Sequence, residues 1–205
     1  MSESLFSLGL GLGSQNSKGE WLDIFCPQPL VQPSDALCKA IAPIVEYKGG
    51  NAAIAVKSEQ MSRVAEAAKA AGDSAQADIA AQLASSSQPL VVTLLAEDAA
   101  PSSVPEGYLK LHLLSHRLAK PHSLDLTGLF GVLPNVAWTN QGPVDLRELP
   151  QRQLDARMKG ELLEIMSVDK FPKMTNYVVP AGVRIAHTAR VRLGAYLGEG
   201  TTIMH

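Results

Sequence analysis

The end of the chain repeats an aliphatic residue at every sixth position. Residues 179–205 read VPAGVR IAHTAR VRLGAY LGEGTT IMH, and the first positions are occupied by Val179, Ile185, Val191, Leu197 and Ile203. A strand buries alternate residues and a helix every third or fourth, so neither has a period of six. A chain wound as a triangular prism has this period, because each flat face takes one hexapeptide. Three hexapeptides, or 18 residues, then complete one coil.

Two further features of residues 179–205 fit such coils. The fifth positions carry small or β-branched residues suited to corners, and glycines between the faces supply turns (Val183, Ala189, Ala195, Thr201; Gly182, Gly194, Gly198, Gly200). Successive coils are expected to stack as parallel strands about 4.8 Å apart, so that one coil alone is not stable. The alternative is an ordinary hairpin over 183–194, which accounts for fewer of these positions.

The preceding residues indicate a mixed α/β domain. Strands are expected over 4–12, 20–26 and 89–96, with short strands over 128–140. Helices are expected over 34–45 with Ser34 as N-cap, 58–72 with Ser58 as N-cap, 74–84 with Asp73 as N-cap, 108–119 opened by a capping box at 103–106, and 149–166. We divide the chain into an N-terminal α/β domain (1–148), a connecting helix and linker (149–175) and hexapeptide coils (176–205).

Composition excludes several classes of protein. Of the 205 residues 46% are hydrophobic and 19% charged, and the net charge of -2 gives no electrostatic reason to expect nucleic acid or a membrane surface as partner. No apolar run approaches the ~20 residues of a membrane-spanning helix, and residues 5–13 lack the basic flank of a signal peptide. Two cysteines, Cys26 and Cys38, do not form a disulfide framework, so we expect a cytoplasmic protein.

The segment VDKFPKMTNYVVPAGVRIAHTARVRLGAYLGEGTTIMH (168–205), together with YLKLHLLSHRLAKPH (108–122), closely resembles the tetrahydrodipicolinate N-succinyltransferases. The resemblance implies an α/β N-terminal domain followed by the start of a left-handed parallel β-helix. It also implies a cytoplasmic homotrimer that transfers succinyl from succinyl-CoA to the amine of a small dicarboxylate acceptor, on the diaminopimelate route to lysine.

The resemblance implies a direct mechanism. A general base takes the amine proton as the amine attacks the thioester, and amide donors hold the oxyanion. In the family, the proposed catalytic acid and most residues that contact CoA lie in later coils, which places them beyond His205. We therefore expect residues 1–205 to be a truncated portion of the enzyme that is inactive alone.

Three arginines on the coil surface are candidates for binding substrate. The guanidinium groups of Arg184, Arg190 and Arg192 suit substrate carboxylates or CoA phosphates. An intersubunit salt bridge or a solvated face is the other explanation. His205 is a further candidate, one coil above His187. The two histidines could share a divalent metal, although two ligands make a partial site, and Ala189 stands where some family members have a metal-binding acid.

Two other clusters invite a chemical interpretation. His112 and His116 are four residues apart on the expected helix, near Arg117, Lys120 and His122, but no HExxH-type acid lies between them. Packing, or a role at a domain interface, is therefore expected. The alternating glycines of GLGLGS (9–14) are a weak phosphate-loop signal because no helix follows. Besides the succinyltransferase, the fold allows another CoA-dependent acyltransferase or a non-catalytic trimerising module.

Overall fold

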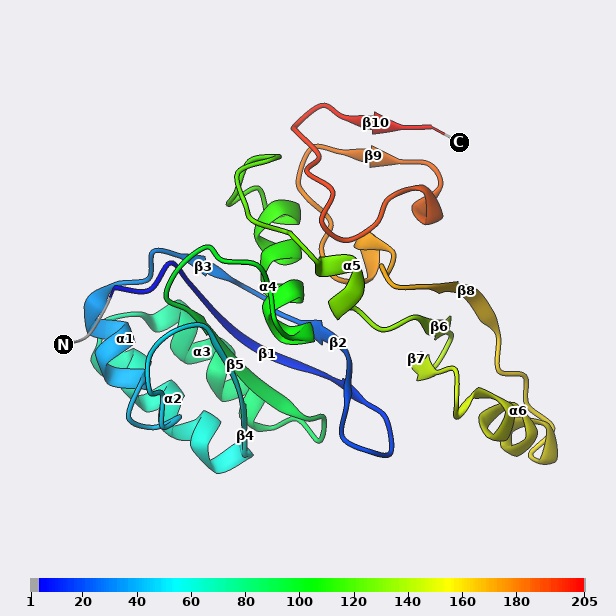
Figure 1. Ribbon diagram of the computed structural model, residues 1–205, viewed down its shortest axis with the longest axis horizontal. Coiled ribbons are helices and arrows are strands. Elements are labelled where there is room, and N and C mark those ends of the chain that lie inside the picture. Colours follow the sequence, from blue (N-terminus) through cyan, green and yellow to red (C-terminus); the bar gives the residue numbers. More distant parts are fainter. Residues whose placement is uncertain (1–3, 205) are drawn as a thin grey trace.

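A five-stranded antiparallel sheet lies at the centre of the computed structural model, which describes residues 4–204 (Figure 1). Its strand order is β2-β1-β5-β4, with β3 also paired to β1. The strands are β1 (Ser7–Gln15), β2 (Trp21–Phe25), β3 (Leu30–Val31), β4 (Ala52–Val56) and β5 (Leu90–Leu95). The strands expected over 4–12, 20–26 and 89–96 are thus present, and β3 and β4 are additional.

The alternation of leucine and glycine in β1 sets what packs on each face of the sheet. Leu8 and Leu10 are buried in a core that they share with α1 (Asp35–Ile41), α2 (Ser58–Ala70) and α3 (Ser74–Ala84). On the other face, a Cβ at Gly9 would come within 2.9 Å of Leu109 in α4 (Val104–Ser115). The GLGLGS stretch is therefore a packing feature, which lets a helix lie directly against the strand.

The sequence located two helix starts correctly. The Ser34 side chain accepts a hydrogen bond from the Leu37 backbone N–H at 3.2 Å, and Asp73 accepts one from Gln76 at 3.0 Å. These contacts satisfy backbone donors that the first turn of a helix leaves free.

Two other expectations at helix starts, the N-cap Ser58 and the capping box at 103–106, were wrong. The N-cap of α2 is Lys57, whose backbone N–H donates to the Gln60 side chain, and the Ser58 hydroxyl instead donates to the Ala84 carbonyl. The capping box expected at 103–106 does not form, because the Glu106 carboxylate accepts from the backbone N–H of Ser102, one residue before the N-cap. Ser103 is nevertheless the N-cap, and the helix expected over 108–119 spans Val104–Ser115.

A three-stranded antiparallel sheet and a helix make up the next part of the chain. The order is β7-β6-β8, formed by β6 (Val136–Thr139), β7 (Gly142–Asp145) and β8 (Ile165–Asp169). The helix expected over 149–166 is wrong in its second half: α6 (Leu149–Met158) ends before Gly160, which has a φ of +76°, and β8 follows. Of the strands expected over 128–140, β6 forms, while α5 (Leu129–Val132) is helical.

The hexapeptide region forms the parallel pairing that its period predicts. β9 (Arg184–Ile185) pairs in parallel with β10 (Thr202–Ile203), with Thr202 opposite Arg184, an offset of 18 residues. The alternative hairpin over 183–194 is therefore wrong. Among the first positions Val191 and Leu197 are buried, and Ile185 and Ile203 are half-buried. Val179 was predicted to point inward but is 64% exposed, because it precedes the first paired strand and no coil lies beneath it.

The C-terminal end of α4 holds this coil in place. The Ser115 hydroxyl accepts from the Gly194 N–H at 2.9 Å and donates to the Ala195 carbonyl at 3.1 Å. The Arg117 guanidinium donates to the carbonyls of Leu197 at 2.6 Å and Ala181 at 2.8 Å. The helix therefore contacts the beginning and the later part of the same coil.

No helix within residues 4–204 has the length and apolar character needed to span a bilayer.

Gly194→Ala should destabilise the contact between α4 and the coil. Gly194 has a φ of +99°, and a Cβ there would come within 2.5 Å of Leu111. Gly200→Ala is the matched control, because Gly200 has a φ of +82° and nothing within 4 Å. We expect Gly200→Ala to cost about 1–2 kcal/mol and Gly194→Ala a further ~1–3 kcal/mol in chemical denaturation. Equal losses would show that the close approach of Leu111 contributes nothing.

Candidate functional site

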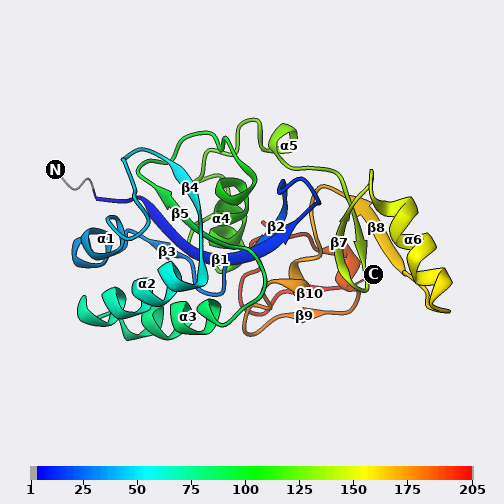
Figure 2. The same cartoon turned by 90° about the horizontal axis from the view of Figure 1, so that it is seen from below.

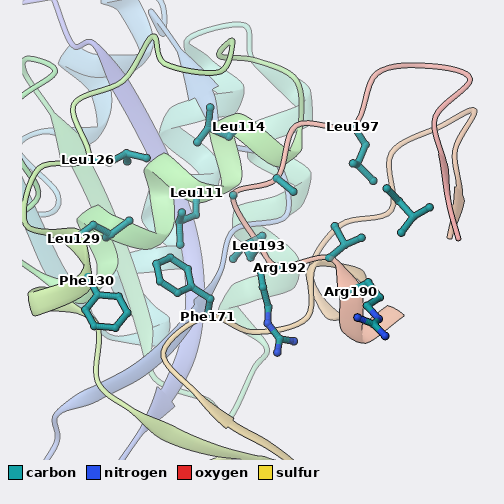
Figure 3. Close-up of a pocket in the computed structure, with 14 residues that line it drawn as sticks. Leu111, Leu114, Leu126, Leu129, Phe130, Phe171, Arg190, Arg192, Leu193 and Leu197 are labelled. Carbon is teal, nitrogen blue, oxygen red and sulfur yellow. The ribbon is translucent and has the colours of Figure 1, made fainter. Parts of the chain in front are cut away.

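An open apolar groove with a volume of about 720 Å³ lies between α4, α5 and the coil (Figure 3). Leucine and phenylalanine side chains dominate its walls, among them Leu111, Leu129, Phe130, Phe171, Leu193 and Leu197. Figure 3 shows Arg190 and Arg192 together on the coil side of the groove. The groove is therefore an apolar surface with two cationic side chains at one border.

Arg192 is held by an acidic residue from the preceding strand. Its Nε lies 3.1 Å from Oδ2 of Asp169 at the end of β8, and about a third of its side chain is exposed (34%). Within the described residues its buried Nη1 atom has no hydrogen-bond partner. The ion pair fixes the guanidinium in position, as expected for a structural role.

The other candidates on the coil are less constrained. Arg190 is exposed at the end of a short 3-10 helix, and Arg184 is exposed on β9 with Nη1 3.5 Å from the Met204 sulfur. His187 is also exposed. The structure thus brings Arg190 and Arg192 together at the groove, while Arg184 and His187 do not line it. His205 lies outside the described residues.

No group of three or more His, Cys, Asp or Glu side chains that could hold a metal ion occurs within residues 4–204. Within this part of the chain His187 therefore does not belong to a group of side chains that could bind a metal, and its pairing with His205 stays a prediction. Cys26 and Cys38 are buried and free, and burial raises the pKa of the Cys26 thiol to about 12. A thiol with that pKa is protonated at neutral pH and is a poor nucleophile.

The histidines of α4 pack rather than react. His112 is fully buried, with Nε2 3.1 Å from the Ile24 carbonyl oxygen, and burial lowers its pKa to about 4. Burial also lowers the pKa of His116, so both rings are neutral at pH 7. The expected packing role is confirmed for His112, and the expected interface role for Arg117 by its bonds to the coil. Lys120 and His122 are exposed.

A buried lysine was missed in the sequence analysis. Lys110 is fully buried in α4, and its ammonium group donates to Asp98 Oδ1 at 2.5 Å and to two backbone carbonyls, of Ala99 at 2.5 Å and Asp125 at 2.8 Å. Three acceptors satisfy the three ammonium donors, which a buried charge requires. The available signal was a lysine flanked by leucines in YLKLHLL, a helix apolar on all sides.

A partly buried carboxylate joins the sheet to the segment that leads into the coil. The Tyr177 hydroxyl donates to Asp23 Oδ2 at 2.6 Å, and the Ser14 backbone N–H donates to Asp23 Oδ1 at 2.8 Å. Desolvation raises the pKa of Asp23, and these two hydrogen bonds oppose the rise. The Tyr177 ring also lies within about 6 Å of the Tyr108 and His112 rings (centroids 6.0 and 5.7 Å).

Two family profiles match most of this structure. The profile described as tetrahydrodipicolinate N-succinyltransferase N-terminal matches residues 41–131, and the one described as tetrahydrodipicolinate N-succinyltransferase middle matches residues 133–173. The first covers the helices and strands from the end of α1 to α5, and the second covers the β6–β8 sheet with α6.

Curated relatives carry one common name, 2,3,4,5-tetrahydropyridine-2,6-dicarboxylate N-succinyltransferase. The Pseudomonas putida protein is 66% identical over 205 residues, which are 100% of this chain and 59% of the relative. The Vibrio cholerae protein is 52% identical over 200 residues, covering 98% of this chain and 58% of the relative. The chain therefore spans just under three fifths of the length of these relatives.

A solved structure shares the fold. A Campylobacter jejuni protein, described provisionally as a 2,3,4,5-tetrahydropyridine-2-carboxylate N-succinyltransferase, superimposes with a TM-score of 0.88 at 24% identity. The alignment covers 98% of this chain and 57% of the other. The arrangement of the sheet, α4 and the coil is thus found at low sequence identity.

Asp23→Asn should stabilise the fold at neutral pH. Because the folded-state pKa of Asp23 is raised, the fold binds this proton more tightly than the unfolded chain, whose carboxyl has a pKa of about 4. Stability from this group is therefore lost as the pH rises through the window between the two values. We expect Asp23→Asn to increase the free energy of unfolding at pH 7, and the difference from wild type to shrink toward pH 4.

Tyr177→Phe is the companion variant, because it removes the hydroxyl that donates to Asp23. It should cost about 1.5–3 kcal/mol at pH 7, as expected for losing a hydrogen bond to a charged group. Urea unfolding followed at several pH values measures both variants. An Asp23→Asn protein less stable than wild type at pH 7 would contradict the argument.

Proposed function

Because this chain belongs to the tetrahydrodipicolinate N-succinyltransferase family, we propose that it acts in succinyl transfer from succinyl-CoA to the amine of ring-opened tetrahydrodipicolinate. The reaction is a step of the diaminopimelate route to lysine. The observation that carries the proposal is the 66% identity with the Pseudomonas putida protein over the whole of this chain. Since this chain covers 59% of that relative, we expect the general base in the part of the relatives that the chain does not match.

We further propose that the coil is the start of a left-handed parallel β-helix, and that the chain divides at about 148 and 175 into domain, linker and coils. The 18-residue offset between β9 and β10 supports the β-helix. Buried first positions at Val191 and Leu197 support it as well. We propose a homotrimer as the working unit, as the resemblance to the family implies. The two buried, free thiols fit the reducing cytoplasm.

For the substrate-binding residues we propose the exposed cations of the coil. Arg184 carries an exposed guanidinium whose Nη1 lies 3.5 Å from the Met204 sulfur, so it is available for a substrate carboxylate or a CoA phosphate. Arg192 is already paired with Asp169, and Arg190 stands exposed at the groove. His205 stays a candidate next to these arginines, and a metal shared between His187 and His205 stays a weaker one.

The direct test is release of free CoA from succinyl-CoA with and without tetrahydrodipicolinate. A chimera in which this chain replaces the matching 205 residues of the Pseudomonas putida protein should release CoA in an acceptor-dependent manner. The chain alone should not release it, and the intact relative is the positive control. A folded but inactive chimera would contradict succinyl transfer and favour the trimerising module. Release with a different amine acceptor alone would favour another acyltransferase.

In the active chimera, Arg184→Ala should raise the KM for one of the two substrates by about 10- to 100-fold, as expected for the loss of a charge-assisted hydrogen bond. Arg184→Lys retains the charge and should recover part of that loss, because the bidentate geometry is missing. Initial rates measured against each substrate separately show which one Arg184 binds. An unchanged KM for both substrates would remove Arg184 from the site.

A further inference from the structure

The helix α4 ends at an arginine with an unusual backbone conformation. Arg117 has a φ of +63° and follows the C-cap His116. Its N–H donates to the Leu114 carbonyl at 3.0 Å. The Leu118 N–H donates to the Leu113 carbonyl at 2.9 Å, which completes the hydrogen-bond pattern of a Schellman motif. The position of Arg117 in this motif is usually taken by glycine, because a side chain is strained at a positive φ.

The guanidinium group of Arg117 joins two separate parts of the coil. Its Nε donates to the Leu197 carbonyl at 2.6 Å, and its Nη2 donates to the Ala181 carbonyl at 2.8 Å. Within residues 4–204 it forms no ion pair with an acidic side chain. Arg117 therefore contributes the geometry of two diverging donors rather than the neutralisation of an acid, and a single ammonium group does not reproduce that geometry.

The two carbonyls that Arg117 binds lie just before the two paired strands of the coil. Ala181 lies shortly before β9, and Leu197 lies shortly before β10. The two strands lie side by side in both views of the molecule (Figures 1 and 2). Arg117 therefore holds the chain at the point where it enters each strand.

Arg184 is fixed in β9 through its backbone. Its N–H donates to the Thr201 carbonyl at 2.9 Å, while its side chain is exposed. The Gly200 N–H donates to the Gly182 carbonyl at 2.8 Å, so the turns before β9 and β10 are also joined. The ladder between the strands is two residues long on each side. The place of the Arg184 guanidinium thus depends on backbone hydrogen bonds next to those of Arg117.

We propose that Arg117 is a positioning residue for Arg184. Its two hydrogen bonds set the place of β9 relative to α4, and Arg184 extends from β9 to the substrate. This inference deepens the proposed function, because it rests on the assignment of Arg184 as a substrate-binding residue. Arg117 acts through the backbone, since its Nε and Nη2 donate to carbonyls of the coil.

A comparison of Arg117→Gly with Arg117→Ala separates this role from a contribution to stability. Both variants lose the two hydrogen bonds to the coil, but glycine relieves the strain at a φ of +63° and alanine retains it. We expect the glycine variant to have the higher melting midpoint, and the two variants to displace β9 to the same extent. If Arg117 had a stabilising role alone, the effect on substrate binding would follow the melting midpoint.

Hydrogen exchange measures the hold on β9 without any turnover. In the chimera with the Pseudomonas putida protein, mass spectrometry follows peptides that contain the Arg184 and Ala186 amides, which donate to carbonyls on the β10 side. Arg117→Gly should speed their exchange by at least about tenfold. Arg117→Lys should restore part of the protection, because an ammonium group can still bind one carbonyl. Lys120→Ala is the matched control, an exposed cation in the same loop, and should leave the exchange unchanged.

Initial rates of the same chimera test whether the displacement of β9 reaches the substrate. Arg117→Gly should raise the KM for the substrate that Arg184→Ala affects by about 3- to 30-fold, and kcat should stay within about twofold, because binding rather than the chemical step is altered. In an Arg184→Ala background, Arg117→Gly should have no further effect on KM, since the side chain through which Arg117 acts is gone.

Four results would overturn the proposal. Unchanged exchange in Arg117→Gly would show that the hydrogen bonds of Arg117 do not hold β9. An unchanged KM despite faster exchange would show that the displacement does not reach the substrate. KM increases that multiply in the double variant would show that Arg117 acts without Arg184, and an unchanged KM in Arg184→Ala would leave Arg117 no substrate-binding residue to position.

The proposed function can fail separately from this inference. An inactive chimera contradicts succinyl transfer, whereas the exchange of the β9 amides still decides whether Arg117 holds the strand that carries Arg184. An active chimera whose exchange is the same in Arg117→Gly and Lys120→Ala upholds succinyl transfer and contradicts the positioning role.

Discussion

The burial of α4 on every side is the constraint on which the rest of the structure depends. Every residue from Pro105 to Ser115 is buried, with the glycine face of β1 on one side and the coil on the other. A helix placed between two layers must satisfy each polar side chain internally. Lys110 does so with three acceptors, whereas His112 stays neutral with Nε2 3.1 Å from the Ile24 carbonyl oxygen, and its buried Nδ1 has no hydrogen-bond partner within residues 4–204.

The coil depends on α4 because a single coil cannot stabilise itself. Two residues of β9 and two of β10 pair, which is far less than the ladder of a complete β-helix. The contacts that hold the coil to the rest of the chain are those of Leu111 with Gly194, the hydrogen bonds of the Ser115 hydroxyl and the two hydrogen bonds of Arg117. The Asp23–Tyr177 hydrogen bond fixes the segment just before the coil, so its approach to the sheet is also set.

Sequence reasoning succeeded where one local interaction determines the structure. Ser34 and Asp73 were predictable as N-caps because their side chains bond to backbone N–H groups of the helix that they begin. The 18-residue offset between β9 and β10 was predictable because it is three hexapeptides. It failed where contacts with residues distant in the sequence determine the secondary structure. The apolar spacing of residues 149–166 fits a helix, but Ile165–Asp169 pairs with β6, a choice that depends on a strand some thirty residues earlier. β4, with the sequence AAIAV, has a weak strand signal and exists because β5 offers it an edge.

The sequence predicted which residues could form the candidate site, but it did not predict the different surroundings of each of them. Arg184, Arg190 and Arg192 look equivalent in the sequence, yet Arg192 is paired with Asp169 while the other two are exposed. The repeat explains this division, since Arg184 and Arg190 occupy the last position of their hexapeptides, pointing away from the interior that Val191 and Leu197 fill. Substitutions at these outer positions leave the coil interior intact, as surface changes generally do. A loss of binding in Arg184→Ala can therefore be attributed to the missing guanidinium rather than to a collapsed coil.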